Sequence, residues 1–191
     1  ALSFVRSKKD VLMLKDLIMS ETKHPVPVIS KIEKPQAITK LESILKVSDG
    51  LMVARGDLGL EIPTEEVPLN QKIMVEMAKK ARKPVIVATQ MMESMIDNLT
   101  PSRAEVNDVA NSVMDGADCI MLSGETSVGK YPCEVVRKIG KIISSVENAD
   151  FGLTQTDSVS INKDRLITNS ICYHAALLAD RIKASAAVSY T

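Results

Sequence analysis

Aromatic residues and net charge are what this sequence has least of. Phe, Tyr and Trp together make up 3% of the 191 residues, Trp is absent, and 24 basic residues balance 24 acidic ones. A chain without net charge has no general electrostatic attraction for nucleic acid or for an anionic membrane surface. We therefore expect neither as a partner.

Cysteine is also scarce, and the residues present, Cys119, Cys133 and Cys172, show no paired spacing. An odd number without a C-x-x-C pair predicts neither a disulfide framework nor a zinc site. Because Cys119 lies in an apolar run, we expect it to be a buried free thiol in a reducing compartment. No run reaches the ~18–20 apolar residues that span a bilayer, and no signal peptide is visible. The sequence starts directly in a strand-like segment, which is typical of the interior of a longer polypeptide.

What the sequence does contain is a regular alternation of apolar runs and amphipathic segments. Runs that are apolar at odd and even positions are typical of strands buried on both faces of a parallel sheet. They lie at 1–5, 26–32, 50–54, 84–89 and 118–122. Strict alternation with helical segments predicts a parallel α/β sheet, either doubly wound or part of a (β/α)8 barrel. No G-x-G-x-x-G follows the first run, which disfavours a dinucleotide-binding fold.

The composition changes towards the end of the chain. We predict that residues 1–148 form one domain and that residues 149–164, rich in Asn, Asp, Ser and Thr, form a linker. Residues 165–191 would begin a second α/β domain, with a helix over 165–182 and a strand over 186–190. Local signals also predict helix starts, by Pro at position 35 and by a Ser-x-x-Glu capping box at 102–105.

Polar residues follow the apolar runs, where the carboxyl ends of parallel strands place functional groups. Lys31 and Glu33 share one face of their strand because side chains alternate. After the next run, Arg55, Gly56 and Asp57 offer successive backbone N–H groups for a carboxylate or phosphate, and a carboxylate for a hard cation. Each group also has an ordinary interpretation, as a buried ion pair, as a strand already emerging into solvent, or as a helix-capping aspartate.

Taken together, these strand ends have the equipment for reactions of a phosphoryl group or an enolate. Glu33 and Asp57 could share one divalent ion, for which Mg²⁺ is the natural candidate, with Lys31 beside it. An ion and a lysine can stabilise an enolate or a transferring phosphoryl group. Thr89 adds a hydroxyl at the end of the next run, although a single threonine there is more often structural.

The same stretches closely resemble those of the pyruvate kinase family. The resemblance rests on ISKIE at 29–33, GLMVARGDLGLEIP at 50–63, KPVIVATQMMESMI at 83–96, PSRAE at 101–105 and DGADCIMLSGETSVGKYP at 115–132. It is nearly continuous from the first residue to about residue 148 and becomes weaker afterwards. The order of the motifs is far more specific than any one of them alone.

The resemblance implies a (β/α)8 TIM barrel, of which this chain holds about strands 4 to 8, followed by the beginning of a C-terminal α/β domain. The family transfers the phosphoryl group of phosphoenolpyruvate to ADP, giving pyruvate and ATP in glycolysis. It requires Mg²⁺ (or Mn²⁺) and, in most members, K⁺. Members are typically cytoplasmic homo-oligomers, as tetramers. The family's potassium site and lid belong to segments that this sequence lacks.

Roles for individual residues follow from the same resemblance. Lys31 matches the catalytic lysine, which also contacts the substrate, and Glu33 and Asp57 match the magnesium ligands. The backbone from Arg55 to Asp57 would hold the substrate carboxylate, and Thr89 would hydrogen-bond that carboxylate from the other side. Thr89 lies near the enolate carbon that receives a proton, but a hydroxyl is a poor acid without help, which favours a water relay.

Two further interpretations stay open beside this one. Another Mg-dependent barrel enzyme acting on phosphoenolpyruvate or pyruvate, such as an aldolase or lyase, would share the enolate chemistry without needing ADP. A half-barrel without catalysis would instead use its open sheet edges to pair with a partner or with itself. Because the first strands and the lid of the family are missing from the sequence, we expect the isolated chain to be an incomplete, inactive portion of the enzyme.

Overall fold

The computed structural model describes residues 1–149 and 166–184. The chain divides into two compact units, Ala1–Ala149 and Asp150–Thr191. In the second unit, helix α9 (Leu166–Arg181) lies where a helix was predicted. The predicted linker, apart from its first residue, and the predicted strand over 186–190 lie outside the described residues.

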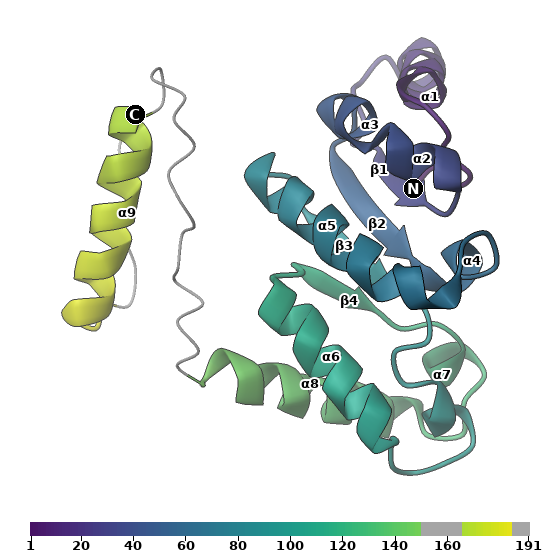
Figure 1. The fold of residues 1–191 in the computed structure, drawn as a ribbon, viewed down its shortest axis with the longest axis vertical. Helices are drawn as coiled ribbons and strands as arrows, with labels where there is room; N and C mark the ends of the chain where they lie inside the picture. The colour runs from purple at the N-terminus through teal and green to yellow at the C-terminus, as the bar shows by residue number, and fades with distance from the viewer. Residues whose placement is uncertain (150–165, 185–191) are drawn as a thin grey trace. The chain divides into compact units, whose positions relative to one another are not determined.

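The first unit is built on a parallel sheet of four strands in the order β1-β2-β3-β4 (Figure 1). The strands are β1 (Ile29–Ile32), β2 (Gly50–Ala54), β3 (Val85–Ala88) and β4 (Cys119–Met121). Each strand pairs in parallel with the next, so that their carboxyl ends all lie at one edge of the sheet. The parallel α/β sheet expected from the alternating pattern is confirmed, and it does not close on itself, as expected for part of a barrel.

The segment predicted as a strand over residues 1–5 forms only an isolated bridge, between Leu2 and Ser30. Leu2 donates its N–H to the carbonyl of Ile29 and accepts the N–H of Lys31, at 2.8 and 2.9 Å. Two residues later Phe4 takes a left-handed backbone, with φ of 56°. Its N–H turns away from the sheet to the side chain of Glu33. The predicted strand was therefore wrong in extent, because a side-chain carboxylate competes with the ladder for this N–H.

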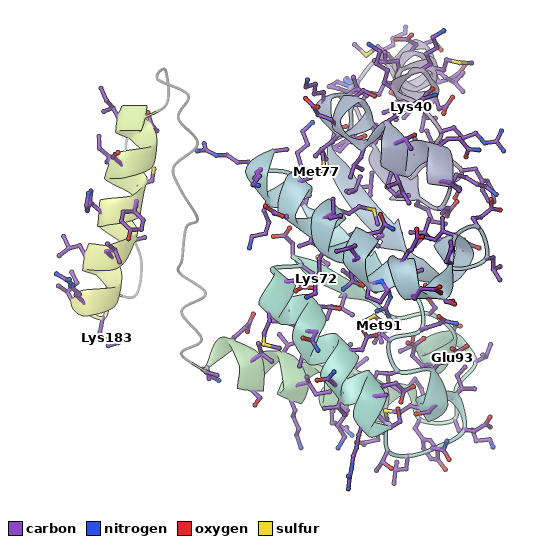
Figure 2. The ribbon with its side chains drawn as sticks, in the orientation of Figure 1. Lys40, Lys72, Met77, Met91, Glu93 and Lys183 are labelled. Carbon is purple, nitrogen blue, oxygen red and sulfur yellow. The ribbon has the colours of Figure 1, made fainter. Side chains whose placement is uncertain are left out.

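Helices and short turns connect the strands and cover the sheet. They are α1 (Lys8–Thr22), α2 (Pro35–Thr39), α3 (Leu41–Val47), α4 (Arg55–Leu58), η1 (Thr64–Glu66), α5 (Val67–Lys80), η2 (Glu93–Ile96), α6 (Arg103–Asp115), α7 (Gly124–Ser127) and α8 (Pro132–Glu147). Helix α5 packs on β2 and β3, and α6 packs between α5 and α8 (Figure 1). Lys72 of α5, labelled in Figure 2, forms an ion pair with Asp115 of α6. None of the described helices combines the length and apolarity that a bilayer crossing requires.

The core lies between the sheet and these helices, and it thins out towards β4. Every residue of β2 is buried, whereas no residue of β4 is. Cys119, expected to be a buried thiol, is exposed. The expectation was wrong because β4 is the last strand of the sheet, with Ile86 of β3 opposite Cys119 on one side and no described strand on the other.

The predicted capping box of α6 is present, and its Glu105 also accepts hydrogen bonds from Ser94, in η2 before the helix. Glu105 accepts the backbone N–H groups of Ser94 at 2.6 Å and of Ser102 at 2.7 Å. It also accepts the Ser94 hydroxyl. Burial raises the pKa of the Glu105 carboxyl, but the hydrogen bonds from Ser94 and Ser102 outweigh it and hold the pKa below its ordinary value.

We expect Glu105→Gln to lower the free energy of unfolding by about 1–2 kcal/mol near neutral pH, because an amide cannot accept all of these hydrogen bonds. Because the pKa of the Glu105 carboxyl is lower in the folded state, its ionisation stabilises the folded state at pH values above the ordinary pKa of about 4.3. This contribution is lost as the pH falls through the pKa of the folded state. Urea unfolding at several pH values should therefore show the variant losing less stability on acidification than the unaltered chain. Glu134→Gln, in the first turn of α8 and exposed, is the control and should change little. Parallel pH curves for Glu105→Gln and the unaltered chain would contradict this.

Candidate functional site

Lys31 and Glu33 lie at the carboxyl end of β1 and face each other, as the alternation of side chains predicted. The Lys31 Nζ atom is 2.5 Å from the Glu33 Oε1 atom. The Glu33 side chain is 1% exposed and the Lys31 side chain 25% exposed, so that a buried carboxylate pairs with an ammonium group that reaches solvent. Lys31 also donates to the Ser3 hydroxyl at 3.2 Å.

The two oxygens of Glu33 have different surroundings. Oε2 accepts the Phe4 N–H at 2.8 Å. Oε1 is buried and accepts no hydrogen bond from the described residues, so that its contact with Lys31 is one of charge without hydrogen-bond geometry. A buried carboxylate is costly unless its charge and lone pairs are both compensated. Oε1 therefore has lone-pair capacity left for a cation.

Asp57 lies in the short helix α4, which begins where β2 ends. Its residue is exposed, and its carboxylate makes no hydrogen bond or ion pair within the described part of the chain. The strands that precede Glu33 and Asp57 are direct neighbours, with Ile32 opposite Val53. Two carboxylates, one with an unsatisfied oxygen and one without partners, fit the hard oxygen ligands that Mg²⁺ prefers.

The described residues contain no group of three His, Cys, Asp or Glu side chains placed to hold a metal ion. A cation at Glu33 and Asp57 would therefore keep most of its coordination positions for water or for substrate oxygens. Mg²⁺ commonly binds in this way, through one or two carboxylates together with substrate phosphates.

Gly56 and Thr89, predicted at neighbouring strand ends, are in direct contact. The Gly56 N–H donates to the Thr89 Oγ1 atom at 2.7 Å, and this hydroxyl donates to the Ala88 carbonyl at 2.6 Å. A Cβ atom on Gly56 would lie 3.2 Å from Thr89 Oγ1, so that glycine permits the close approach. The N–H group predicted to receive a ligand carboxylate is thus held by the threonine predicted to share that ligand.

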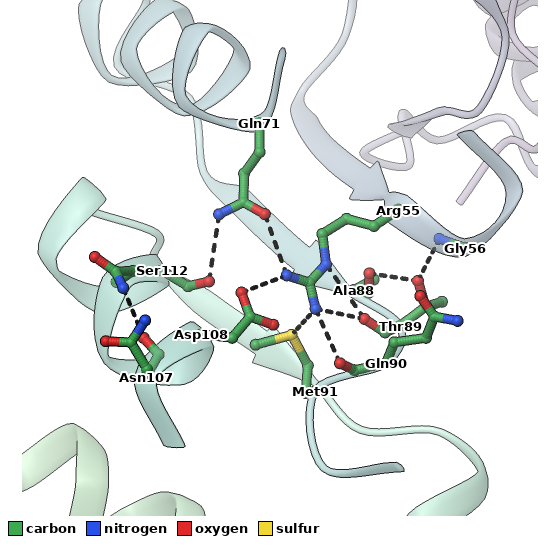
Figure 3. A network of polar contacts seen from close by, with 11 residues as sticks. Arg55, Gly56, Gln71, Ala88, Thr89, Gln90, Met91, Asn107, Asp108 and Ser112 are labelled. Carbon is green, nitrogen blue, oxygen red and sulfur yellow. Dashed lines mark hydrogen bonds and ion pairs between the residues drawn. The ribbon is translucent and has the colours of Figure 1, made fainter. Parts of the chain in front are cut away.

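The Arg55 side chain lies among acceptors from the strand end next to it (Figure 3). Its Nη2 atom donates to the carbonyls of Thr89 at 2.7 Å and Gln90 at 3.2 Å. The same atom contacts the Met91 sulfur at 2.8 Å. The guanidinium group is therefore committed to the protein, and only the backbone of Arg55 remains for a ligand.

Two residues that hold Arg55 were not found by reasoning from the sequence. Its Nη1 atom donates to Asp108 Oδ1 at 2.7 Å and, at 3.4 Å, to Gln71 Oε1. Gln71 in turn donates to the buried Ser112 hydroxyl at 3.4 Å. A signal was present in the sequence, because Gln71 stands where the apolar stripe of α5 would continue, three residues before the buried Met74.

The short helix α7, which follows β4, contains the buried Glu125. Its side chain accepts the N–H groups of Met92 at 3.2 Å and Ser123 at 2.7 Å. It therefore joins the segments that follow β3 and β4, and both of its oxygens are satisfied within the protein. This is a structural role.

A cleft of about 320 Å³ opens beside α4, with Arg55, Gly56, Gln90 and Asp108 among its lining residues. Neither Lys31 nor Glu33 lines it. The cleft therefore lies on the Arg55 side of α4, and it is distinct from the predicted cation site.

Comparison with known proteins bears on this arrangement. A family model described as "Pyruvate kinase, barrel domain" matches residues 1–136. The chain is 50% identical over all of its 191 residues to the pyruvate kinase of Mycobacterium intracellulare, of which it covers 39%. It is 55% identical over 147 residues to that of Thermotoga maritima, which is 77% of this chain and 31% of the relative.

A solved structure gives the same result for the fold. The crystal structure of a pyruvate kinase from Cryptosporidium parvum superposes with a TM-score of 0.83 and 37% sequence identity. The match covers 96% of this chain and 39% of that one. The chain thus spans 39% of the length of the Mycobacterium intracellulare relative, which it matches from end to end.

Proposed function

Since the chain belongs to the pyruvate kinase family, we propose that it carries the part of the active site that binds phosphoenolpyruvate and a divalent cation during phosphoryl transfer to ADP. The observation that carries this proposal is the buried Glu33 carboxylate, whose Oε1 atom accepts no hydrogen bond from residues 1–149 or 166–184 and lies 2.5 Å from the Lys31 Nζ atom. The chain spans 39% of the length of its Mycobacterium intracellulare relative. We therefore assign turnover to the complete polypeptide and expect none from the isolated chain.

Glu33 and Asp57 are the residues that would hold Mg²⁺ or Mn²⁺. When bound there, the ion supplies positive charge that stabilises a transferring phosphoryl group and an enolate. The K⁺ that most members of the family require is assigned to the rest of the polypeptide. A water relay that starts at Thr89 delivers the proton to the enolate carbon.

Lys31 supplies the second positive charge at this site. Its ammonium group is partly exposed and lies against a buried carboxylate, so that it is held in place and can still reach a ligand. It neutralises negative charge on the phosphoryl group and on the bridging oxygen, and then on the enolate that remains. This stabilisation grows as the bond to phosphorus breaks, which is what lowers the barrier.

The substrate carboxylate is received at α4. Of the backbone N–H groups from Arg55 to Asp57, that of Gly56 points to the end of β3, where it donates to the Thr89 hydroxyl at 2.7 Å. A carboxylate that arrives there accepts the Gly56 N–H in place of the threonine, and the Thr89 hydroxyl turns to donate to the same carboxylate. The contact between Gly56 and Thr89 is thus a preformed receptor that exchanges an internal partner for the ligand.

The remaining assignments follow from the family. ADP and ATP are the second substrate and product, pyruvate is the other product, and the complete protein is a cytoplasmic homo-oligomer, a tetramer, acting in glycolysis. ADP dependence distinguishes this function from that of an aldolase or lyase with the same cation site.

The proposal is tested by calorimetric titration of the chain with oxalate, which mimics the enolate of pyruvate, with and without Mg²⁺. We expect Mg²⁺-dependent binding that Asp57→Asn weakens by at least about tenfold, since one charged oxygen ligand of the ion is lost. Asp57 is exposed and its carboxylate makes no hydrogen bond or ion pair with the described residues, so that we expect this change to leave the fold intact.

Glu33→Gln should abolish the Mg²⁺ dependence, with circular dichroism confirming that the variant is folded. Glu61→Gln is the matched control, because this carboxylate is 38% exposed and its ion-pair partner is Lys34, not Lys31. Oxalate binding that is indifferent to Mg²⁺, or an Asp57→Asn variant that binds as well as Glu61→Gln does, would contradict the assignment. A folded chain that binds no oxalate would show that the half-site is not assembled in isolation.

A further inference from the structure

The turn that follows β3 has a backbone that its residues do not favour. Thr89 and Gln90 have φ values of 71° and 54°, in the left-handed region. Residues other than glycine rarely adopt backbone angles in this region, and β-branched residues such as Thr89 are the least suited to it. Such strain persists only where the surrounding structure holds it in place, and it is found most often at functional sites.

The Arg55 side chain is what holds this turn. It donates to the Thr89 carbonyl from Nη2 at 2.7 Å and from Nε at 3.3 Å. It also donates to the Gln90 carbonyl, so that both strained residues are bound by one guanidinium group. The third contact, to the sulfur of Met91, reaches a fully buried side chain and anchors the end of the turn in the core.

Arg55 is in turn aimed by residues from two helices. Asp108 of α6 forms an ion pair with it at 2.7 Å, and Gln71 of α5 accepts a hydrogen bond from the same nitrogen (Figure 3). The Arg55 side chain is 11% exposed, which leaves it little solvent and little freedom to move. The planar, rigid fork of a guanidinium group suits this arrangement, since its donors reach acceptors on several sides at once.

We propose that Arg55 is a positioning residue, which acts through Thr89. Held by Asp108, its guanidinium group keeps the strained turn in place and so keeps the Thr89 hydroxyl on the Gly56 N–H. This inference rests on the proposed function, in which the Gly56 N–H and the Thr89 hydroxyl receive the substrate carboxylate. The side chain touches neither substrate nor cation, and its effect reaches the site through the backbone of residues 89 and 90.

The substitution Arg55→Lys separates positioning from a simple ion pair. Lysine keeps the positive charge for Asp108, but a single ammonium group cannot also serve the carbonyls of Thr89 and Gln90 in the fixed geometry of a fork. An ion pair that only joins helices would survive this change. The hydrogen bonds that hold the Thr89 and Gln90 carbonyls would be lost.

The test uses the chain as it is, in solution NMR. The ¹³Cα and ¹³Cβ shifts of Thr89 and Gln90 report their backbone conformation, and amide exchange reports the hydrogen bond of Gly56. In Arg55→Lys we expect the shifts of both residues to leave the left-handed range and Gly56 exchange to become at least about tenfold faster, because the amide loses its fixed partner. Asp108→Asn should move both readouts in the same direction, and it decides the question if Arg55→Lys does not fold.

Lys72→Met is the matched control, since it removes another ion pair made by α6, that of Asp115 with Lys72 of α5. It should leave the Thr89 shifts and Gly56 exchange unchanged. Unchanged Thr89 shifts in both Arg55→Lys and Asp108→Asn would overturn the proposal, and so would a Lys72→Met variant that moves them equally.

Oxalate titration in the presence of Mg²⁺ gives the second readout. Arg55→Lys should weaken binding by about tenfold where Lys72→Met does not, as expected for a misplaced contact of about 1.4 kcal/mol. Shifted Thr89 signals with unaltered oxalate affinity would overturn the role in positioning. Absence of binding by the unaltered chain would count against the proposed function alone, and the NMR comparison would still decide whether Arg55 controls Thr89.

Discussion

Replacing Lys31 with methionine is expected to lower the free energy of unfolding by about 3 kcal/mol, the lower end of the cost of breaking a buried ion pair. Glu33 is 1% exposed, and Lys31 is the cation that its Oε1 atom contacts. Removing that cation leaves a buried carboxylate with a single hydrogen bond from the described part of the chain, that of the Phe4 N–H. The lower end applies because Lys31 itself is 25% exposed, so that water partly replaces its charge.

Urea unfolding of Lys31→Met, of Glu33→Gln and of the variant with both changes measures this effect. Lys31→Met with Glu33→Gln should recover at least half of the loss, because the double variant has no charge left to bury. Lys15→Met is the control: its pair with Asp49 is 32% and 39% exposed, and its loss should cost less than about 1 kcal/mol. If Lys31→Met costs no more than the control does, Glu33 is not a buried, charged carboxylate.

The strands were predictable because their pattern is local. Residues 50–54 are apolar at every position, and β2 has the predicted bounds and is buried throughout. The capping box at 102–105 likewise needs only four neighbouring residues, and it is present. Side-chain alternation alone placed Lys31 and Glu33 on one face. In each case the interaction that decides the structure joins residues close in sequence.

The errors arose where distant segments decide the structure. The exposure of Cys119 depends on whether a further strand lies beside β4, which an apolar run does not reveal. The strand over residues 1–5 was lost to a hydrogen bond between Phe4 and Glu33, 29 residues apart. In the candidate site, too, the contact that reasoning from the sequence missed joins distant segments. Arg55 was noticed for its backbone, but its side chain meets Asp108 across 53 residues of sequence, and no spacing rule relates the two.

Phosphoryl transfer from phosphoenolpyruvate to ADP is expected only when the chain is joined to the segments that its relatives have and it lacks. The most direct experiment uses a chimera in which this chain replaces the matching 39% of the Mycobacterium intracellulare enzyme, to which it is 50% identical. The isolated chain should show no turnover, and the chimera should form pyruvate in a manner that depends on ADP and Mg²⁺. Pyruvate formation without ADP would instead favour a lyase.

Within that chimera, Lys31→Met is expected to lower kcat on the order of 10³-fold, with a much smaller change in the KM for phosphoenolpyruvate. The positive charge of Lys31 matters most when negative charge gathers on the enolate oxygen, so its loss affects the transition state more than the bound substrate. Lys34→Met is the matched control, a lysine three residues further along that pairs with the exposed Glu61, and it should keep kcat within about twofold. Circular dichroism gives the folded fraction by which each rate is divided, so that the stability loss of Lys31→Met is not counted as lost catalysis. A folded Lys31→Met chimera with kcat within tenfold of that of the unaltered chimera would show that Lys31 does not act in the catalytic step. Turnover by the isolated chain would show that the strand ends of this unit suffice for the reaction.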